Sequence, residues 1–185
     1  MFQQKAAASA ELRKSLVPLR IFSLPETGGQ LNIATHVYYY NDLAERTAKR
    51  KVSAMNEEWV AFVNDSRQHV AKQHSNLYQE NVDIMRKVGC EGLVVPESPD
   101  SGAVYEIKRY RKDKDTTEED IISTIKTVTE ATLVSIMTSK IGLRNEQIEI
   151  WRHPLGMNFV DSKEEEVRTD LRTSFHQPLA FSPWK

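Results

Sequence analysis

The chain has 185 residues, with 25 lysines and arginines against 26 aspartates and glutamates, so its formal net charge is −1 at pH 7. This balance gives no general electrostatic argument for nucleic acid as a partner, and we expect no nucleic-acid binding. The single cysteine, Cys90, excludes an internal disulfide and a zinc site built from several cysteines. No apolar run approaches the roughly 20 residues that a membrane-spanning helix needs.

The first 20 residues carry four basic side chains against one acidic side chain, Glu11, with alanine and serine between them. An amphipathic, acid-poor start of this kind resembles a mitochondrial presequence. The alternative, which we favour, is an ordinary first helix over residues 5–16. It would end before Pro18, because proline disfavours helical geometry in the residue that precedes it.

A β-hairpin is predicted next. Residues 19–24 form a short strand, and residues 25–30 (PETGGQ) form a turn in which Gly28 and Gly29 can take positive φ. Residues 31–41 then alternate in side-chain type and are rich in aromatic and β-branched residues. This pattern is typical of a strand in a half-buried sheet.

The second strand of this hairpin carries a candidate ligand site. Asn32, His36, Tyr38 and Tyr40 share one of its faces. Sheet-lined cavities use such groups as acid, base or hydrogen-bond donor, so these four residues are candidates to line a ligand cavity. The alternative is a hydrogen-bonded histidine inside a barrel, with structural aromatic residues around it.

A helix over residues 42–55 follows, and either Asn41 or Asp42 can cap its first turn. Its basic residues are candidates to bind an anion or an acidic partner, and the alternative is an ordinary solvated helix face. These interaction candidates are Arg46, Lys49 and Arg50, with Lys51 beside them. Further along, Trp59, Phe62 and Val63 have the i, i+3, i+4 spacing of a core-facing helix.

The turn-rich segment 91–103 is the predicted linker between two units. After it, residues 104–111 alternate as a strand, and Thr116 with Glu119 matches a capping box at the head of a long helix. The apolar stripe predicted for that helix extends to Thr132, and a strand follows at residues 145–153, after the turn at Gly142.

The C-terminal part is polar over residues 155–173, which predicts at most a short exposed helix. The last nine residues, QPLAFSPWK, contain two prolines and are expected to be extended. Phe181 and Trp184 in this tail need cover from this chain or from a partner, so they are further interaction candidates.

Sequence motifs give no catalytic centre. The chain contains no GxGxxG, GxxxxGK[ST], GxSxG or HExxH motif, and its five histidines lack metal-ligand spacing. Lys87 and Arg86 near Cys90 could lower the pKa of its thiol, but an unreactive cysteine is the favoured interpretation. We therefore expect no catalytic residue, no metal and no cofactor.

Several segments together resemble the NIPSNAP family. They are LNIATHVYYYNDLAERTAKRKVSAMNEEW, KQHSNLY, VYEIKRY, NEQIEIW and PLAFSP, in the order in which the family has them. The resemblance implies an α+β protein of ferredoxin-like units that form a dimeric or pseudo-dimeric α/β barrel. The first unit, residues 1–90, has no counterpart of the strand that opens the second unit, residues 104–185.

The resemblance also implies a function. We expect a non-enzymatic interaction or scaffold protein, mitochondrial in the matrix or at a membrane, with a role in organelle quality control or trafficking. A cytoplasmic location is the alternative. Protein partners, a homo- or hetero-oligomer and peripheral membrane association follow as expectations. Two alternatives stay open: a small-ligand, haem-binding or cofactor-poor monooxygenase-like barrel that uses His36, and an accessory subunit of a large mitochondrial complex.

Overall fold

The computed structural model describes residues 2–28, 32–93, 103–112, 115–127, 131–142, 145–153, 168–179 and 182–183. Its helices are α1 (Phe2–Ala8), α2 (Ala10–Leu16), α3 (Leu43–Met55), α4 (Glu57–Arg67), α5 (Val82–Val88) and α6 (Glu118–Thr127). Its strands are β1 (Leu19–Thr27), β2 (Thr35–Tyr38), β3 (Leu77–Glu80), β4 (Val104–Lys112), β5 (Thr132–Ile141), β6 (Glu146–His153) and β7 (Arg168–Pro178).

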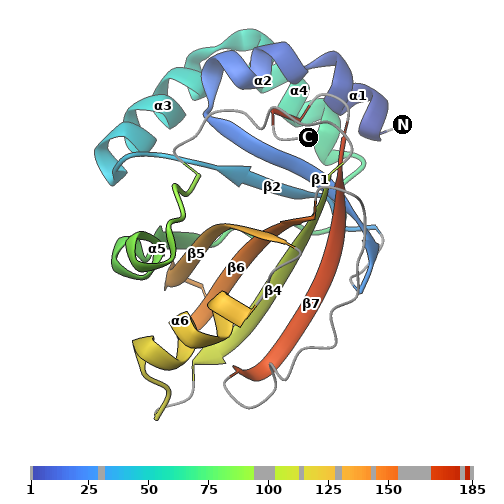
Figure 1. The fold of residues 1–185 in the computed structure, drawn as a ribbon. Helices are drawn as coiled ribbons and strands as arrows, with labels where there is room; N and C mark the ends of the chain where they lie inside the picture. Colours follow the sequence, from blue (N-terminus) through green and yellow to red (C-terminus); the bar gives the residue numbers. More distant parts are fainter. Residues whose placement is uncertain are drawn as a thin grey trace.

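The seven strands form one sheet in the order β2-β1-β7-β4-β6-β5-β3, and every neighbouring pair is antiparallel. The sheet curls into a half-barrel, with α1 to α4 over its β1–β2 end and α5 and α6 beside β5 and β6 (Figure 1). In the second half of the chain the order β7-β4-β6-β5 is ferredoxin-like. The predicted α+β class with ferredoxin-like architecture is thereby confirmed.

Both halves of the chain build this sheet together. From the first half, β1 pairs with β7 and β3 pairs with β5, so each half supplies a neighbour to the other. Among the described residues of the first half, no strand corresponds to β4.

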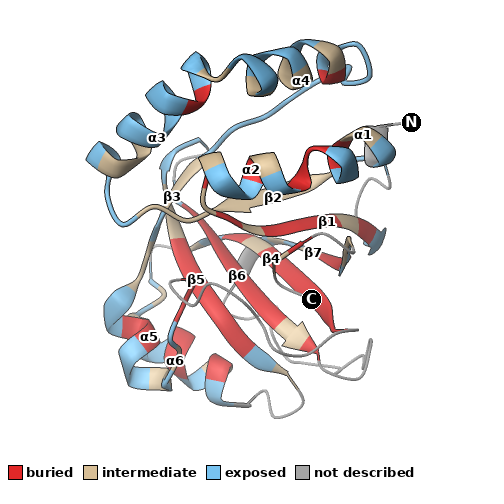
Figure 2. Cartoon of the chain, turned by 90° about the horizontal axis from the view of Figure 1, so that it is seen from above, coloured by how far each residue is buried: buried red, intermediate tan, exposed pale blue. Residues whose placement is uncertain are grey.

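Most residues of the central strands are buried (Figure 2), and apolar side chains pack on both faces of the sheet. The inner core, on the face away from the helices, consists of strand and loop residues: Ile21, Leu93, Ala103, Tyr105, Ile107, Val134, Met137, Ile148 and Ile150. On the helix-covered face, Trp151 of β6 packs with residues of α5, α6 and β5, and Phe22 packs with Ala6 and Leu19 beneath α1.

Local sequence signals account for two of the boundaries. Asp42 caps α3, since its Oδ1 accepts a hydrogen bond of 2.7 Å from the Glu45 amide. Gly28 ends β1 with a φ of 76°, as the turn prediction expects. A Cβ at Gly28 would lie 2.4 Å from the carbonyl oxygen of Thr173 in β7, so this position requires glycine for two reasons.

Several boundaries differ from the predictions. β1 continues to Thr27, into the predicted turn, and the helix predicted over residues 5–16 is divided into α1 and α2. The strand expected over residues 31–41 is paired only over Thr35–Tyr38. The long helix ends at Thr127, and the residues from Thr132 onward form β5, because the run TLVSI favours a strand. The capping box lies one residue later than predicted, where the Thr117 amide and the Asp120 carboxylate are 2.8 Å apart. Both threonines fit the pattern, and sequence alone could not separate them.

The largest correction concerns the C-terminal part, where at most a short exposed helix was predicted up to residue 173. Residues 168–178 instead form β7, which pairs with both β1 and β4. Its sequence, RTDLRTSFHQP, is polar, but Ser174 and His176 are buried and hydrogen-bonded. Ser174 Oγ lies 2.9 Å from His176 Nε2, and Ser23 Oγ lies 3.3 Å from His176 Nδ1. Residues 154–167 lie outside the described residues.

Candidate functional site

His36 lies on the helix-covered face of β2. Strand alternation places Val37 and Tyr39 against the inner core, and Tyr38 against the cluster beneath α1. The His36 ring stacks on Phe22 with 4.3 Å between ring centroids. The candidate histidine therefore faces the helices, whereas the inner core occupies the opposite face.

Arg13 of α2 is the central side chain of this site. It is only 4% exposed, and its Nη1 donates to the Tyr38 hydroxyl at 2.9 Å and lies 3.2 Å from Nδ1 of His36. Three aromatic rings surround its guanidinium group at 5.1 to 5.5 Å, those of Phe22, Trp59 and Phe62. Cation–π contacts of this kind stabilise a desolvated guanidinium group.

The charge state of His36 follows from these contacts. Burial, and secondarily the positive charge of Arg13, lowers the pKa of His36 from 6.5 to about 3. The imidazole is thus neutral at physiological pH, and Nδ1 can accept a hydrogen bond from Arg13. Burial likewise lowers the pKa of His176 to about 4, with Arg109 as the second cause.

The other ligand-lining candidates are spread over different environments. Asn32 is exposed and Tyr40 is half-buried. The pKa of Tyr40 is raised, mainly by burial, while Arg50 and Arg46 of α3 oppose that rise. The structure therefore brings His36 and Tyr38 together through Arg13, places Tyr40 beside α3, and leaves Asn32 in solvent. A ligand role for these four residues stays a prediction.

Helix α3 exposes an unusual amount of apolar surface. Leu43, Val52 and Met55 are 63%, 57% and 70% exposed. Val52 and Ala48 line a groove of about 270 Å³ between α2 and α3, whose other lining residues are Ser15, Leu16, Glu45 and Lys49. Of the predicted interaction residues, Lys49 and Arg50 are exposed and Arg46 is half-buried.

The C-terminal tail lies on this chain at Leu179 and at Ser182. The amide of Leu179 donates to the Phe22 carbonyl at 2.9 Å, and Oγ of the buried Ser182 accepts from the Phe22 amide at 3.1 Å. Phe181 and Trp184 themselves lie outside the described residues, so their interaction role stays a prediction.

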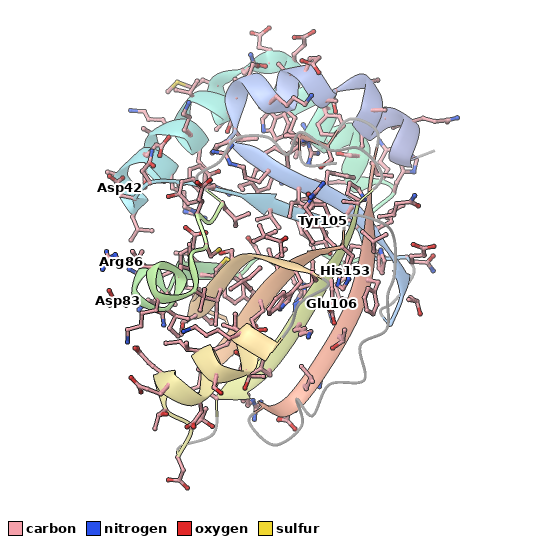
Figure 3. All side chains as sticks on the ribbon, viewed as in Figure 1. Asp42, Asp83, Arg86, Tyr105, Glu106 and His153 are labelled. Atoms are coloured by element: carbon pink, nitrogen blue, oxygen red, sulfur yellow. The ribbon has the colours of Figure 1, made fainter. Side chains whose placement is uncertain are left out.

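A buried polar network on β4 and β6 was not predicted as a site. His153 Nε2 and Glu106 Oε2, both labelled in Figure 3, are 3.0 Å apart on the paired strands β6 and β4. Lys108 Nζ lies 3.5 Å from the same carboxylate. Further along β6, the fully buried Glu149 accepts from the Tyr110 hydroxyl at 2.6 Å and from Trp151 Nε1 at 2.9 Å. The sequence pattern that could have predicted this network is the series of polar residues at alternate positions of two otherwise apolar strands.

The lone thiol has an inert environment. Cys90 Sγ donates to the Val134 carbonyl at 3.0 Å, and burial is the main reason that its pKa rises to about 11. In the part of the chain that the structure describes, no three histidine, cysteine or acidic side chains cluster as metal ligands. No helix within the same residues is long and apolar enough to cross a membrane.

Comparison with known families decides the relationship of the first half. The NIPSNAP family model matches residues 3–81. The chain carries a NIPSNAP domain. Comparisons with curated proteins and with solved structures gave no match.

The matched segment contains the contact between Arg13, His36 and Tyr38 and the exposed surface of α3. Its matched residues run from α1 through β3 and include Arg13, His36 and all of α3. The buried network of β4 and β6 lies beyond the matched segment. The sequence resemblance noted for the second half therefore stays a prediction.

Proposed function

We propose that this protein is a non-enzymatic interaction module of the NIPSNAP type, and that α3 contacts an acidic surface of a partner protein. The observation that carries the proposal is the exposed apolar surface of α3, with Val52 and Met55 on it, next to basic side chains. Exposed apolar area rimmed by charge is typical of protein–protein contact sites.

The charge of α3 supports an acidic partner. Four basic residues, Arg46, Lys49, Arg50 and Lys51, stand against one acidic residue, Glu45, in a chain whose net charge is −1. Glu45 is already occupied at the start of the helix, because its Oε2 accepts from the Asn41 amide at 2.8 Å. The free charge on this surface is thus positive, which favours encounter with carboxylates.

The cellular role goes with this proposal. We propose that the module acts in organelle quality control or trafficking at mitochondria, as a homo- or hetero-oligomer, by extension from the family. The helices α1 and α2 are part of the fold, since Ala6 is fully buried and Arg13 is nearly so. A mitochondrial location would therefore require that residues 2–16 are retained, which N-terminal sequencing of the protein from isolated mitochondria would check.

The experiment is affinity purification from cells with the full chain and three variants. Lys49→Glu and Met55→Ser should each lower recovery of the same partner by roughly threefold to tenfold, since one reverses a rim charge and the other removes apolar contact area. Lys126→Glu, an exposed lysine on α6, is the matched control and should leave recovery unchanged. The purified pair should also dissociate more readily at high salt.

Equal recovery with all three variants would remove α3 from the proposal. Loss of binding that is insensitive to salt would argue for an apolar partner surface instead of an acidic one, and would overturn the partner chemistry proposed here.

A further inference from the structure

We propose that the sheet holds an open position for an eighth strand between β2 and β3, and that an extended segment of a partner protein binds there by strand addition. This site does not involve α3, so it goes beyond the interaction surface proposed above. The inference comes from the strand count, the internal correspondence of the two halves and the contacts along the two edges.

With seven strands, the two edge strands β2 and β3 cannot pair with each other in the antiparallel way that every other neighbouring pair uses. Strand directions alternate along the seven strands from β2 to β3, so these two edge strands run in the same direction. One further strand, antiparallel to both, would complete an all-antiparallel barrel of eight strands. Closed antiparallel barrels use even numbers of strands, and eight strands give an interior that side chains just fill.

The second half shows which strand would occupy the position. The hairpin β5–β6 corresponds to β1–β2, and β7 corresponds to β3, because β1 pairs with β7 just as β5 pairs with β3. In the second half β4 lies between β6 and β7. The corresponding place in the first half lies between β2 and β3, and no described strand fills it.

Contacts at one end link β3 to β1, the strand that pairs with β2. Arg20 Nε, on β1, donates to the Leu93 carbonyl at 2.7 Å, and the Leu93 amide donates to Glu80 Oε1, on β3, at 2.8 Å. A single residue therefore bridges the two sides at this end. Val37 and Tyr39 from one side and Tyr78 from the other pack against the same inner core.

The occupant can be described by its chemistry. The inward side chains of β4, Tyr105 and Ile107, are almost fully buried, so an occupant of the corresponding place needs large apolar residues at alternate positions. A second copy of the chain does not supply such a strand from its described residues. Its inner strands are paired on both sides, and its β2 and β3 are each already tied on one side. The occupant is therefore a segment that is unpaired in its own protein.

The test uses a labelled peptide that copies residues 104–111, VYEIKRYR, with the full chain. The Tyr39 amide donates to the Pro18 carbonyl, just before β1, and the Asn81 amide donates to the Ile136 carbonyl in β5, so both point away from the open position. Because amides alternate in direction along a strand, the amides of His36, Tyr38, Tyr78 and Glu80 face the open position. We expect one peptide to bind per chain and to slow hydrogen exchange of amides on both edges.

The matched control is the same peptide with methylated backbone nitrogens at alternate positions, which keeps its side chains and blocks strand pairing along one of its two edges. We expect the affinity of this peptide for the chain to be lower by about tenfold or more. Equal binding of the two peptides, or protection confined to one edge, would overturn the proposal. So would slow exchange on both edges in the free chain at every concentration, because the position would then be filled from within. The Lys49→Glu variant should bind the peptide unchanged, which separates this result from the fate of the α3 proposal.

Discussion

Arg13 and His36 form a buried contact between α2 and β2. The guanidinium group lies among three aromatic rings, and the histidine beside it is held neutral by burial and by that positive charge. A neutral imidazole can accept the hydrogen bond that Arg13 offers. The pair thus joins α2 to β2, and His36 binds a proton less readily in the folded chain than in the unfolded chain.

The pH dependence of stability follows from the depressed pKa of His36. The unfolded chain binds a proton near pH 6.5 and the folded chain only near pH 3, so stability is lost as the pH falls through this window. His36→Gln should reduce the loss in free energy of unfolding between pH 7 and pH 4 by roughly 1–2 kcal/mol. Urea unfolding at several pH values measures it.

The control for this experiment is His69→Gln, at an exposed histidine. His176 contributes acid sensitivity in the same direction in every variant, so the His36 effect is a difference between parallel curves. Identical pH profiles for His36→Gln and the parent chain would contradict the assignment.

Glu149 carries a second residue-level prediction. Glu149→Ala removes the acceptor of Trp151 Nε1, whereas the Tyr110 hydroxyl still has Gln147 Oε1 at 3.0 Å, so we expect a loss of roughly 1–3 kcal/mol in the free energy of unfolding. Glu149→Gln keeps one acceptor oxygen and should lose less. Glu57→Ala, an exposed glutamate on α4, is the control and should lie within about 0.5 kcal/mol of the parent. If Glu149→Ala matches that control, the network does not stabilise the fold.

At the scale of single elements, the turn after β1 depends on Gly28. Gly28→Ala should lower stability by more than about 1 kcal/mol, because alanine is strained at a φ of 76° and its Cβ would meet the Thr173 carbonyl. Gly89→Ala is a matched comparison, with φ 71° and no atom within 4 Å of the added Cβ. Thermal unfolding of both variants separates the backbone strain from the clash with β7. Equal losses of stability in the two variants would show that β1 and β7 shift enough to relieve the clash at Gly28.

Sequence patterns predicted elements whose side chains alternate or cap clearly. The Asp42 cap, the glycine turn and the strand around Val104 were all within reach, since each rests on neighbouring residues. The face of β2 that meets the helices was not, because both faces of that strand carry aromatic residues. Strand β7 was not predicted either, since its polar residues are buried through partners far away in sequence.

On the scale of the whole molecule, the pairings β1–β7 and β3–β5 join the two halves. We therefore expect one cooperative thermal transition for the full chain, although the sequence suggests two units separated at residues 91–103. Differential scanning calorimetry measures this directly, because the calorimetric and van't Hoff enthalpies agree for a single transition. Two resolved transitions would mean that each half keeps its own stability.

The position of β7 in the sheet has a consequence for synthesis of the protein. β1 is made early, yet one of its two neighbours begins at Arg168, about 140 residues after Thr27. At a translation rate of roughly 5–20 residues per second, β7 is synthesised on the order of 10 s after β1. During this interval the edge of β1 that β7 later covers has no β7 to pair with, so the nascent chain needs protection from aggregation before the sheet is complete.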